Sequence, residues 1–182
     1  RYKYGYQNIM FIVAGEVIEE ITGQSWEEFV QTRIFNPLDM NNSSLTNSGF
    51  NDSQNIARPH LKGKVQEFIS YDNSGPAASI NSSVADILKW ARFWLSKGRI
   101  DTNQILSERS YYTITKSYTS LNAGKGENVG GTHFSSTGLG WFLKDYAGRK
   151  IISHGGGLPG FLSRIAIVPE DSLGIIVLQN DM

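Results

Sequence analysis

One stretch near the C-terminal end constrains this chain more than any other: a histidine followed at once by glycines, between two strand-like segments. It reads Ser153-His154-Gly155-Gly156-Gly157-Leu158-Pro159-Gly160-Phe161. Before it, residues 139–141 and 149–153 flank a turn at Tyr146-Ala147-Gly148, which is typical of a hairpin, and after it residues 161–168 alternate like another strand. We expect His154 to close its strand and the glycines to expose backbone N–H groups, as an oxyanion or other anion site requires.

Two other interpretations of these glycines are possible. Gly155-x-Gly157-x-x-Gly160 matches the dinucleotide-binding fingerprint in form, but that motif must lead into a helix. Residues 161–168 predict a strand instead, which disfavours nucleotide binding. The glycines could also form a wide turn, with His154 merely ending a strand. Motifs elsewhere in the chain are needed to distinguish a simple turn from a functional site at these glycines.

The composition excludes several classes of function. The chain has 182 residues, of which 40% are hydrophobic, enough for one globular domain or a large part of one. Seventeen basic and 17 acidic residues cancel, and no basic stripe is interleaved with aromatics, so no nucleic-acid partner is expected. There is no cysteine, and His60, His133 and His154 are scattered, so we expect no metal and no cofactor. No apolar run reaches the about 18 residues that a transmembrane helix needs.

Helices are predicted in the first part of the chain. A helix from Ile9 to Thr22, with Val17, Ile18 and Ile21 facing inward, should end at Gly23. The capping box Ser25-x-x-Glu28 opens a second helix, which Pro37 stops. A third helix begins at Ser82 or Ser83, where Asp86 completes a capping-box-like pair. Val84, Ile87, Leu88, Ala91 and Leu95 line its core face, and Gly98 ends it. A shorter helical segment is expected near residues 107–114.

Long polar loops and strands make up the remainder. Residues 41–76 predict a loop with one short strand at 65–71, and residues 121–137 predict a second, glycine-rich loop. Gly124-Lys125-Gly126 in that second loop lacks the rest of a phosphate-binding P-loop. After the His154 turn come strands at 161–168 and 173–178. Helices first and an antiparallel meander last indicate an α+β fold.

Several motifs, taken in order, resemble the serine β-lactamase and penicillin-binding protein superfamily, in its class C-like branch. Tyr6-Gln7-Asn8 resembles the Y-x-N motif, and Ile34-Phe35-Asn36-Pro37-Leu38-Asp39-Met40 resembles the signature after it. Three later stretches resemble further motifs of the superfamily. Its P-A-G-G segment is matched by residues 76–86, and its G-L-G-W strand by Gly138-Leu139-Gly140-Trp141. Its third motif, with histidine in place of lysine, is matched by His154-Gly155-Gly156-Gly157. The resemblance covers residues 1–182 as a partial domain, with about 1–120 mainly helical or loop and about 137–182 in antiparallel strands.

The resemblance implies a role for each matched residue. Tyr6 would take or relay the proton of a serine nucleophile, and Asn8 would orient the substrate and a lysine. His154 stands where the third motif has lysine, with Gly155 and Gly156 as substrate-binding residues. The N–H of Gly157 would be an oxyanion donor. The alternative for the first motif is that Tyr6 is a buried aromatic and Asn8 a helix cap. The four tryptophans are expected to be core residues rather than site residues: Trp26, Trp90, Trp94 and Trp141.

The chain departs from the pattern at one decisive point: it contains no S-x-x-K, the motif that holds the family's nucleophile. In the family that motif precedes Y-x-N, so we expect it upstream of Arg1 and expect this chain alone to be inactive. The resemblance implies a serine hydrolase acting on esters, β-lactams or D-amino-acid peptides, with the N-terminal segment as its partner and a periplasmic or secreted location. Since neutral histidine replaces a permanently charged lysine, an ester or peptide is favoured over a β-lactam. A non-catalytic recognition module of the same fold is the alternative.

Overall fold

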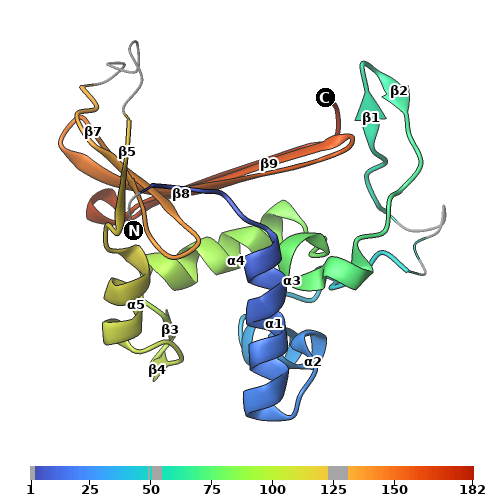
Figure 1. Ribbon diagram of the computed structural model, residues 1–182, viewed down its shortest axis with the longest axis horizontal. Coiled ribbons are helices and arrows are strands. Elements are labelled where there is room, and N and C mark those ends of the chain that lie inside the picture. Colours follow the sequence, from blue (N-terminus) through green and yellow to red (C-terminus); the bar gives the residue numbers. More distant parts are fainter. Residues whose placement is uncertain (1–2, 49, 51–54, 123–130) are drawn as a thin grey trace. The chain divides into compact units, whose positions relative to one another are not determined.

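The computed structural model describes residues 3–48, 50, 55–122 and 131–182, and its elements confirm an α+β fold (Figure 1). The helices are α1 (Ile9–Thr22), α2 (Trp26–Val30), η1 (Gln31–Phe35), η2 (Asp72–Ser74), α3 (Gly75–Ala78), α4 (Val84–Leu95), α5 (Glu108–Thr115) and η3 (Pro169–Asp171). The strands are β1 (His60–Leu61), β2 (Lys64–Val65), β3 (Arg99–Ile100), β4 (Asn103–Gln104), β5 (Thr119–Leu121), β6 (Ser135–Thr137), β7 (Phe142–Tyr146), β8 (Arg149–Leu158), β9 (Phe161–Val168) and β10 (Leu173–Gln179).

The chain divides into two units, and several elements contribute residues to both. Unit 1 comprises Arg1–Gly5, Trp90–Gly155 and Arg164–Val177, and unit 2 comprises Tyr6–Lys89, Gly156–Ser163 and Leu178–Met182. Within the described residues, no helix is long and apolar enough to cross a membrane.

The first helices of unit 2 begin and end where local chemistry dictates. The N–H of Gly23, at φ 66°, bonds to the carbonyl of Glu19 and ends α1, as predicted. The Ser25 hydroxyl accepts a hydrogen bond from the N–H of Glu28, and the Glu28 carboxylate accepts one from the N–H of Ser25. The predicted capping box is therefore confirmed, although the helix continues into the π-helical turn η1 before Pro37.

Close packing inside unit 2 depends on two small residues. A Cβ added at Gly15 of α1 would lie 2.3 Å from Cγ of Pro76, and one at Gly75 would lie 2.9 Å from the Trp26 ring. Helix α3 therefore packs directly against both α1 and α2. Gly15 is the buried residue of α1, whereas Val17 and Ile21 are 49% and 78% exposed, so the inward face predicted for this helix is wrong.

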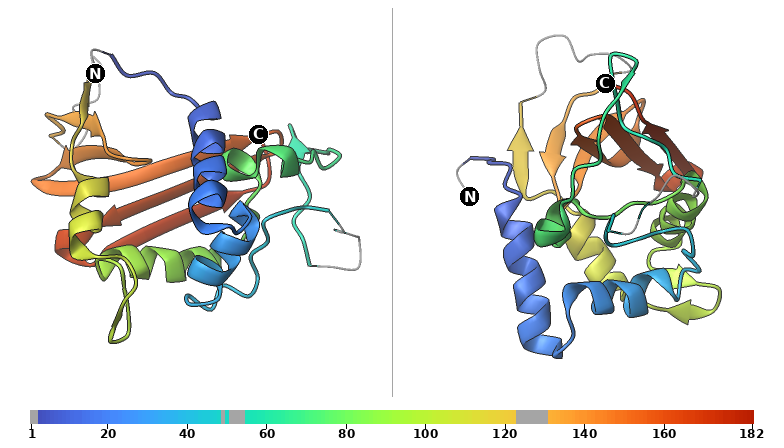
Figure 2. Two further views of the ribbon diagram at one scale, coloured as in Figure 1. Left: turned by 60° about the horizontal axis from the view of Figure 1, so that its bottom comes forward. Right: turned by 90° about the vertical axis from the view of Figure 1, so that its right-hand side faces the viewer.

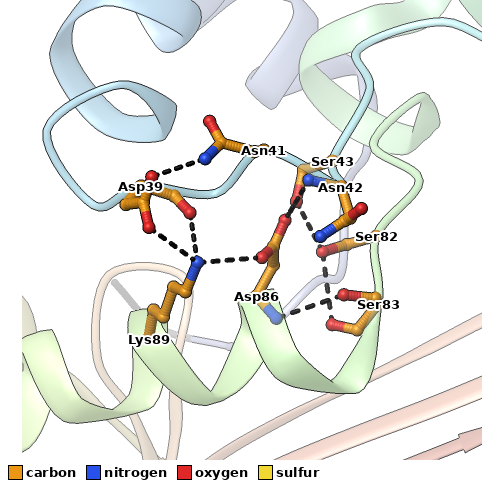
Figure 3. Close-up of polar contacts among 8 residues, drawn as sticks. All are labelled: Asp39, Asn41, Asn42, Ser43, Ser82, Ser83, Asp86 and Lys89. Atoms are coloured by element: carbon orange, nitrogen blue, oxygen red, sulfur yellow. Dashed lines mark hydrogen bonds and ion pairs between the residues drawn. The ribbon is translucent and has the colours of Figure 1, made fainter.

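A polar network joins the N-terminus of α4 to the segment that follows η1 (Figure 3). Asp86 is fully buried, and its Oδ2 accepts hydrogen bonds from the N–H of Asn42 at 2.7 Å and the hydroxyl of Ser43 at 2.8 Å. Its Oδ1 lies 3.4 Å from the Lys89 ammonium, which also contacts Asp39. Ser83 caps the helix through the N–H of Asp86, but the Asp86 carboxylate turns away to Asn42 and Ser43 instead of completing a capping box.

The loop before α3 and the exposed face of α4 differ from the prediction. The strand expected at residues 65–71 is absent; β1 and β2 form a two-residue ladder, with His60 opposite Val65. Val84 and Leu88, predicted to line the core, are 45% and 42% exposed, while Asp86 between them is buried. The prediction for Val84 and Leu88 is therefore wrong, whereas Ala91 on the same predicted face is 2% exposed and is buried as predicted.

The core of unit 1 is aromatic. Trp94 contacts Trp90, Tyr111 and Trp141 through ring pairs 5.1 to 5.7 Å apart, and Phe93 stacks on Trp90. Trp94 and Trp141 are 5% and 7% exposed, and Trp26 of unit 2 is 8% exposed, so these three tryptophans belong to the core, as predicted. Gly98 has φ 84° and ends α4, also as predicted.

The large sheet is an antiparallel meander in the order β10-β9-β8-β7-β6-β5, whose strands lie side by side in Figure 2. Strand β7 pairs with β8 through the turn at Ala147 and Gly148, which both have positive φ. The hairpin predicted here is confirmed, with its first strand beginning at Phe142 rather than at Leu139. Part of the glycine-rich loop predicted at 121–137 also forms strand, in β5 and β6, and residues 123–130 lie outside the described residues.

Asp145 of β7 fixes the start of β6 within unit 1. Its Oδ1 accepts hydrogen bonds from the N–H groups of His133 at 2.8 Å and Phe134 at 2.6 Å, and its Oδ2 lies 3.0 Å from Nδ1 of His133. The Phe134 hydrogen bond is the largest cause that lowers the pKa of Asp145, to about 2.

We expect this anchor to weaken only in strong acid. Because the folded-state pKa lies below the ordinary value of 3.8, the anchor contributes fully above pH 3.8 and is lost as the pH falls through about 2. Carboxyl-carbon NMR should therefore find a midpoint near 2 for Asp145, with amide protection of His133 and Phe134 lost over the same range. The Asp145→Asn variant should lack that pH dependence, and a midpoint near 3.8 would contradict the anchor.

Candidate active site

The glycine run is part of a strand, not the turn after one. Strand β8 continues through His154 and the three glycines to Leu158, so the prediction that His154 closes its strand is wrong. The turn comes later, at Pro159 and Gly160, and Gly160 has φ 82°. A strand follows this turn instead of a helix, which removes the dinucleotide-binding interpretation.

One edge of β8 is left open along the glycine run. The last pair between β7 and β8 joins Phe142 to Ser153, and β7 begins at Phe142. Among the described residues, β8 has β9 as its neighbour on the other side, but residues 154–158 have no partner from β7. Backbone N–H and C=O groups on this edge are therefore available to a ligand.

Two of the three glycines make room for side chains of β9. A Cβ added at Gly155 would lie 2.6 Å from Nη1 of Arg164, and one at Gly156 would lie 2.4 Å from the Ser163 hydroxyl oxygen. A Cβ at Gly157 would meet only an ordinary contact, 3.6 Å from Leu162. None of the three glycines has positive φ, so no unusual backbone conformation requires glycine here. What glycine provides is space for the neighbouring side chains.

His154 lies half-buried in unit 1 against an aromatic neighbour. Its ring centroid is 5.5 Å from that of Phe142, and Phe142 in turn contacts Tyr4 edge-on at 6.0 Å. Burial is the largest influence and lowers the pKa of His154 below its ordinary value; a hydrogen bond with the Gly155 backbone opposes it, and the positive charge of Arg164, the smallest of the three influences, lowers the pKa further. The imidazole is therefore neutral at pH 7 and can donate or accept a hydrogen bond.

Arg164 is a charged residue next to the glycine run that the sequence reasoning missed. Its guanidinium lies over Gly155 and is a permanent cation. The signal was present in the sequence: a two-residue hairpin turn at 159–160 places residues 155 and 164 opposite each other. Strand β9 therefore contributes a positive charge opposite Gly155.

Tyr6 and Asn8 stand before and at the start of α1, in unit 2. Tyr6 is 54% exposed, so the bland interpretation as a buried aromatic is wrong. Asn8 occupies the N-cap position with helical backbone angles, but its side chain makes no capping hydrogen bond, so that interpretation also fails. Both side chains are exposed.

The candidate residues are distributed over both units. Unit 1 brings His154, Gly155 and Arg164 together, whereas Tyr6, Asn8, Gly156 and Gly157 belong to unit 2. The convergence of Tyr6 with His154 stays a prediction.

Comparisons with known proteins place this geometry in a class and then in a family. The chain has the β-lactamase and transpeptidase-like fold: a penicillin-binding protein homologue from Pyrococcus abyssi, described as octameric, superposes with a TM-score of 0.80 at 22% identity over 98% of this chain and 39% of its own. A D-amino acid amidase from Ochrobactrum anthropi superposes with a TM-score of 0.76 at 20% identity, over 98% of this chain and 55% of its own. Residues 2–182 match the Beta-lactamase family model, and the chain belongs to that family.

Curated relatives are longer than this chain. An unguisins hydrolase from Aspergillus campestris is 31% identical over 99% of this chain and 34% of its own length. Protein flp from Staphylococcus aureus is 24% identical over 98% of this chain and 33% of its own. The chain therefore spans about a third of the length of these relatives.

Proposed function

We propose that this chain forms part of a serine hydrolase that works through an acyl-enzyme on esters, β-lactams or D-amino-acid peptides. The observation that carries the proposal is the open edge of β8, where residues 154–158 combine an imidazole with a run of glycines. Such an edge offers N–H donors to a developing oxyanion and room for a substrate backbone. Family membership and hydrolases among the relatives support the same class of chemistry.

The roles follow from the chemistry of each group. The Gly157 N–H donates to the oxyanion, Gly155 and Gly156 admit the substrate, and His154 hydrogen-bonds to it as a neutral ring. Tyr6 takes the proton of the nucleophile and returns it to the leaving group, and Asn8 orients the reacting groups. The nucleophilic serine and its lysine belong to an S-x-x-K motif, which the 182 residues do not contain.

Arg164 widens the substrate class. Histidine in place of lysine alone favours neutral esters and amides, because a neutral ring cannot pair with a carboxylate. The guanidinium over Gly155 adds a permanent positive charge on the neighbouring strand. Substrates that carry a carboxylate, β-lactams included, are therefore part of the proposal.

Hydrolysis assays test the proposal directly. The 182-residue chain is expected to be inactive alone, and a protein that joins it to the upstream coding sequence with S-x-x-K is expected to hydrolyse p-nitrophenyl acetate or nitrocefin with a burst of product. A folded protein with an intact S-x-x-K that turns over neither compound contradicts the proposal. An upstream sequence without that serine and lysine favours a recognition module of the same fold, because neither it nor the 182 residues would then contain the motif that holds the nucleophile.

A further inference from the structure

Three aromatic rings in unit 1 form a continuous series that ends at His154. Phe142 pairs with Ser153, the residue before His154, at the point where β7 begins. Its ring is tilted by 39° to the imidazole at 5.5 Å. On its other side the Tyr4 ring meets it at 71° and 6.0 Å, in an edge-to-face arrangement.

Phe142 occupies a position that neither the sheet nor the core requires to be aromatic. It is half-buried, whereas Trp141 and Leu143 on either side of it are 7% and 5% exposed and belong to the core. Beyond Phe142 the edge of β8 is open, so this ring is the last group of β7 beside the candidate site. A flat apolar ring at that point limits the rotation of the imidazole and its access to water.

We propose that Phe142 is a positioning residue: its ring, held from behind by Tyr4, fixes the plane of the His154 imidazole and shields it from water. The inference deepens the proposed function, in that His154 is taken as a residue of that site. The inference adds Phe142 to the proposed site, a residue that lies outside the Y-x-N and histidine-glycine motifs.

The electrostatics of His154 agree with this arrangement. Burial is the largest cause that lowers its pKa. The charged group that acts on it is Arg164 of β9, which also lowers the pKa, while β7 contributes the uncharged Phe142 ring and β8 the backbone of Gly155. If Phe142 is removed, water reaches the imidazole and the pKa of His154 should rise toward its ordinary value, leaving the opposing effects of the Gly155 hydrogen bond and of Arg164.

NMR titration of the histidine ring protons in the 182-residue chain tests the inference without any assay of activity. In Phe142→Ala we expect the His154 midpoint to rise and its ring signal to broaden or move toward that of a mobile histidine, while His133 stays unchanged as an internal reference. Phe142→Leu keeps apolar bulk and should give a smaller rise. Phe161→Ala, the same truncation of another half-buried phenylalanine, which belongs to unit 2, should leave His154 unaffected.

The outcomes separate this inference from the proposed function. A folded Phe142→Ala protein with an unchanged His154 titration overturns the positioning role, whatever the enzyme does. Should that variant not fold, Tyr4→Ala serves in its place, because it leaves Phe142 present but unsupported; a rise in the His154 midpoint supports the role and no change overturns it. If His154 responds as expected but the S-x-x-K protein hydrolyses nothing, the positioning role stands and the proposed reaction falls. In an active protein, Phe142→Ala should shift the acid limb of the kcat profile to higher pH.

Discussion

Replacement of Asp86 by alanine should destabilise the chain by about 3 to 6 kcal/mol, because two hydrogen bonds to a buried charged acceptor are lost and each is worth about 1.5 to 3 kcal/mol. Asp86 is fully buried, and its carboxylate satisfies the N–H of Asn42, the hydroxyl of Ser43 and the charge of Lys89. Alanine leaves the Asn42 N–H without its partner and removes one partner each from Ser43 and Lys89, which keep their contacts with Ser82 and Asp39. Urea unfolding followed by tryptophan fluorescence measures the change, because Trp26 in the same unit becomes exposed when that unit unfolds.

Asp39 provides a matched control for this experiment. It contacts the same lysine as Asp86, with Nζ of Lys89 3.4 Å from its Oδ2, but its side chain is 77% exposed. Asp39→Ala should therefore cost under about 1 kcal/mol, as exposed ion pairs do. Equal effects of the two substitutions would mean that the network in Figure 3 does not hold the 39–44 segment to α4.

Elements whose signals are local could be predicted from the sequence. Gly23 and Gly98 both adopt positive φ and end helices, and Ser25 with Glu28 opens one, because each depends on backbone chemistry within a few residues. The hairpin at Ala147-Gly148 and strand β9 follow from turn residues and alternation in the same way. The order of helices and strands was therefore sufficient to indicate an α+β fold.

Features that depend on distant partners could not be predicted. Asp86 reads as a capping residue, but its carboxylate binds Asn42 and Ser43, which lie 44 and 43 residues away. The apolar face of α4 was predicted from hydrophobicity alone, so Val84 and Leu88 were wrongly expected in the core. No periodicity within a single helix contains that information.

The glycine run shows a different limit. Glycine is unfavourable in strands, so three in succession indicated the end of one. The structure instead continues β8 beside β9, because Arg164 and Ser163 occupy the space that side chains at 155 and 156 would fill. The sequence thus predicted a site at this place from the glycines, but Arg164 was missed because the turn at 159–160, which places it opposite Gly155, was not used to pair the two strands.

Tyr6→Phe should lower kcat by about 100- to 10,000-fold in a protein that joins this chain to an upstream S-x-x-K, the range by which general acid–base catalysis contributes. Phenylalanine keeps the ring but removes the hydroxyl that would carry the proton. Because the Tyr6 side chain is 54% exposed, folding stability should change little, and KM should change less than kcat. Steady-state and burst kinetics with a p-nitrophenyl ester measure both parameters.

The control for Tyr6 is Tyr146→Phe, the same loss of a hydroxyl from a tyrosine that is 40% exposed at the end of β7. It should leave kcat unchanged, because Tyr146 flanks the Ala147-Gly148 turn at the opposite end of the β7–β8 pairing from His154. If Tyr6→Phe also keeps full activity while its thermal unfolding is unaltered, the phenol has no part in proton transfer. The base would then have to come from another group, and His154, neutral at pH 7, would be the first to test.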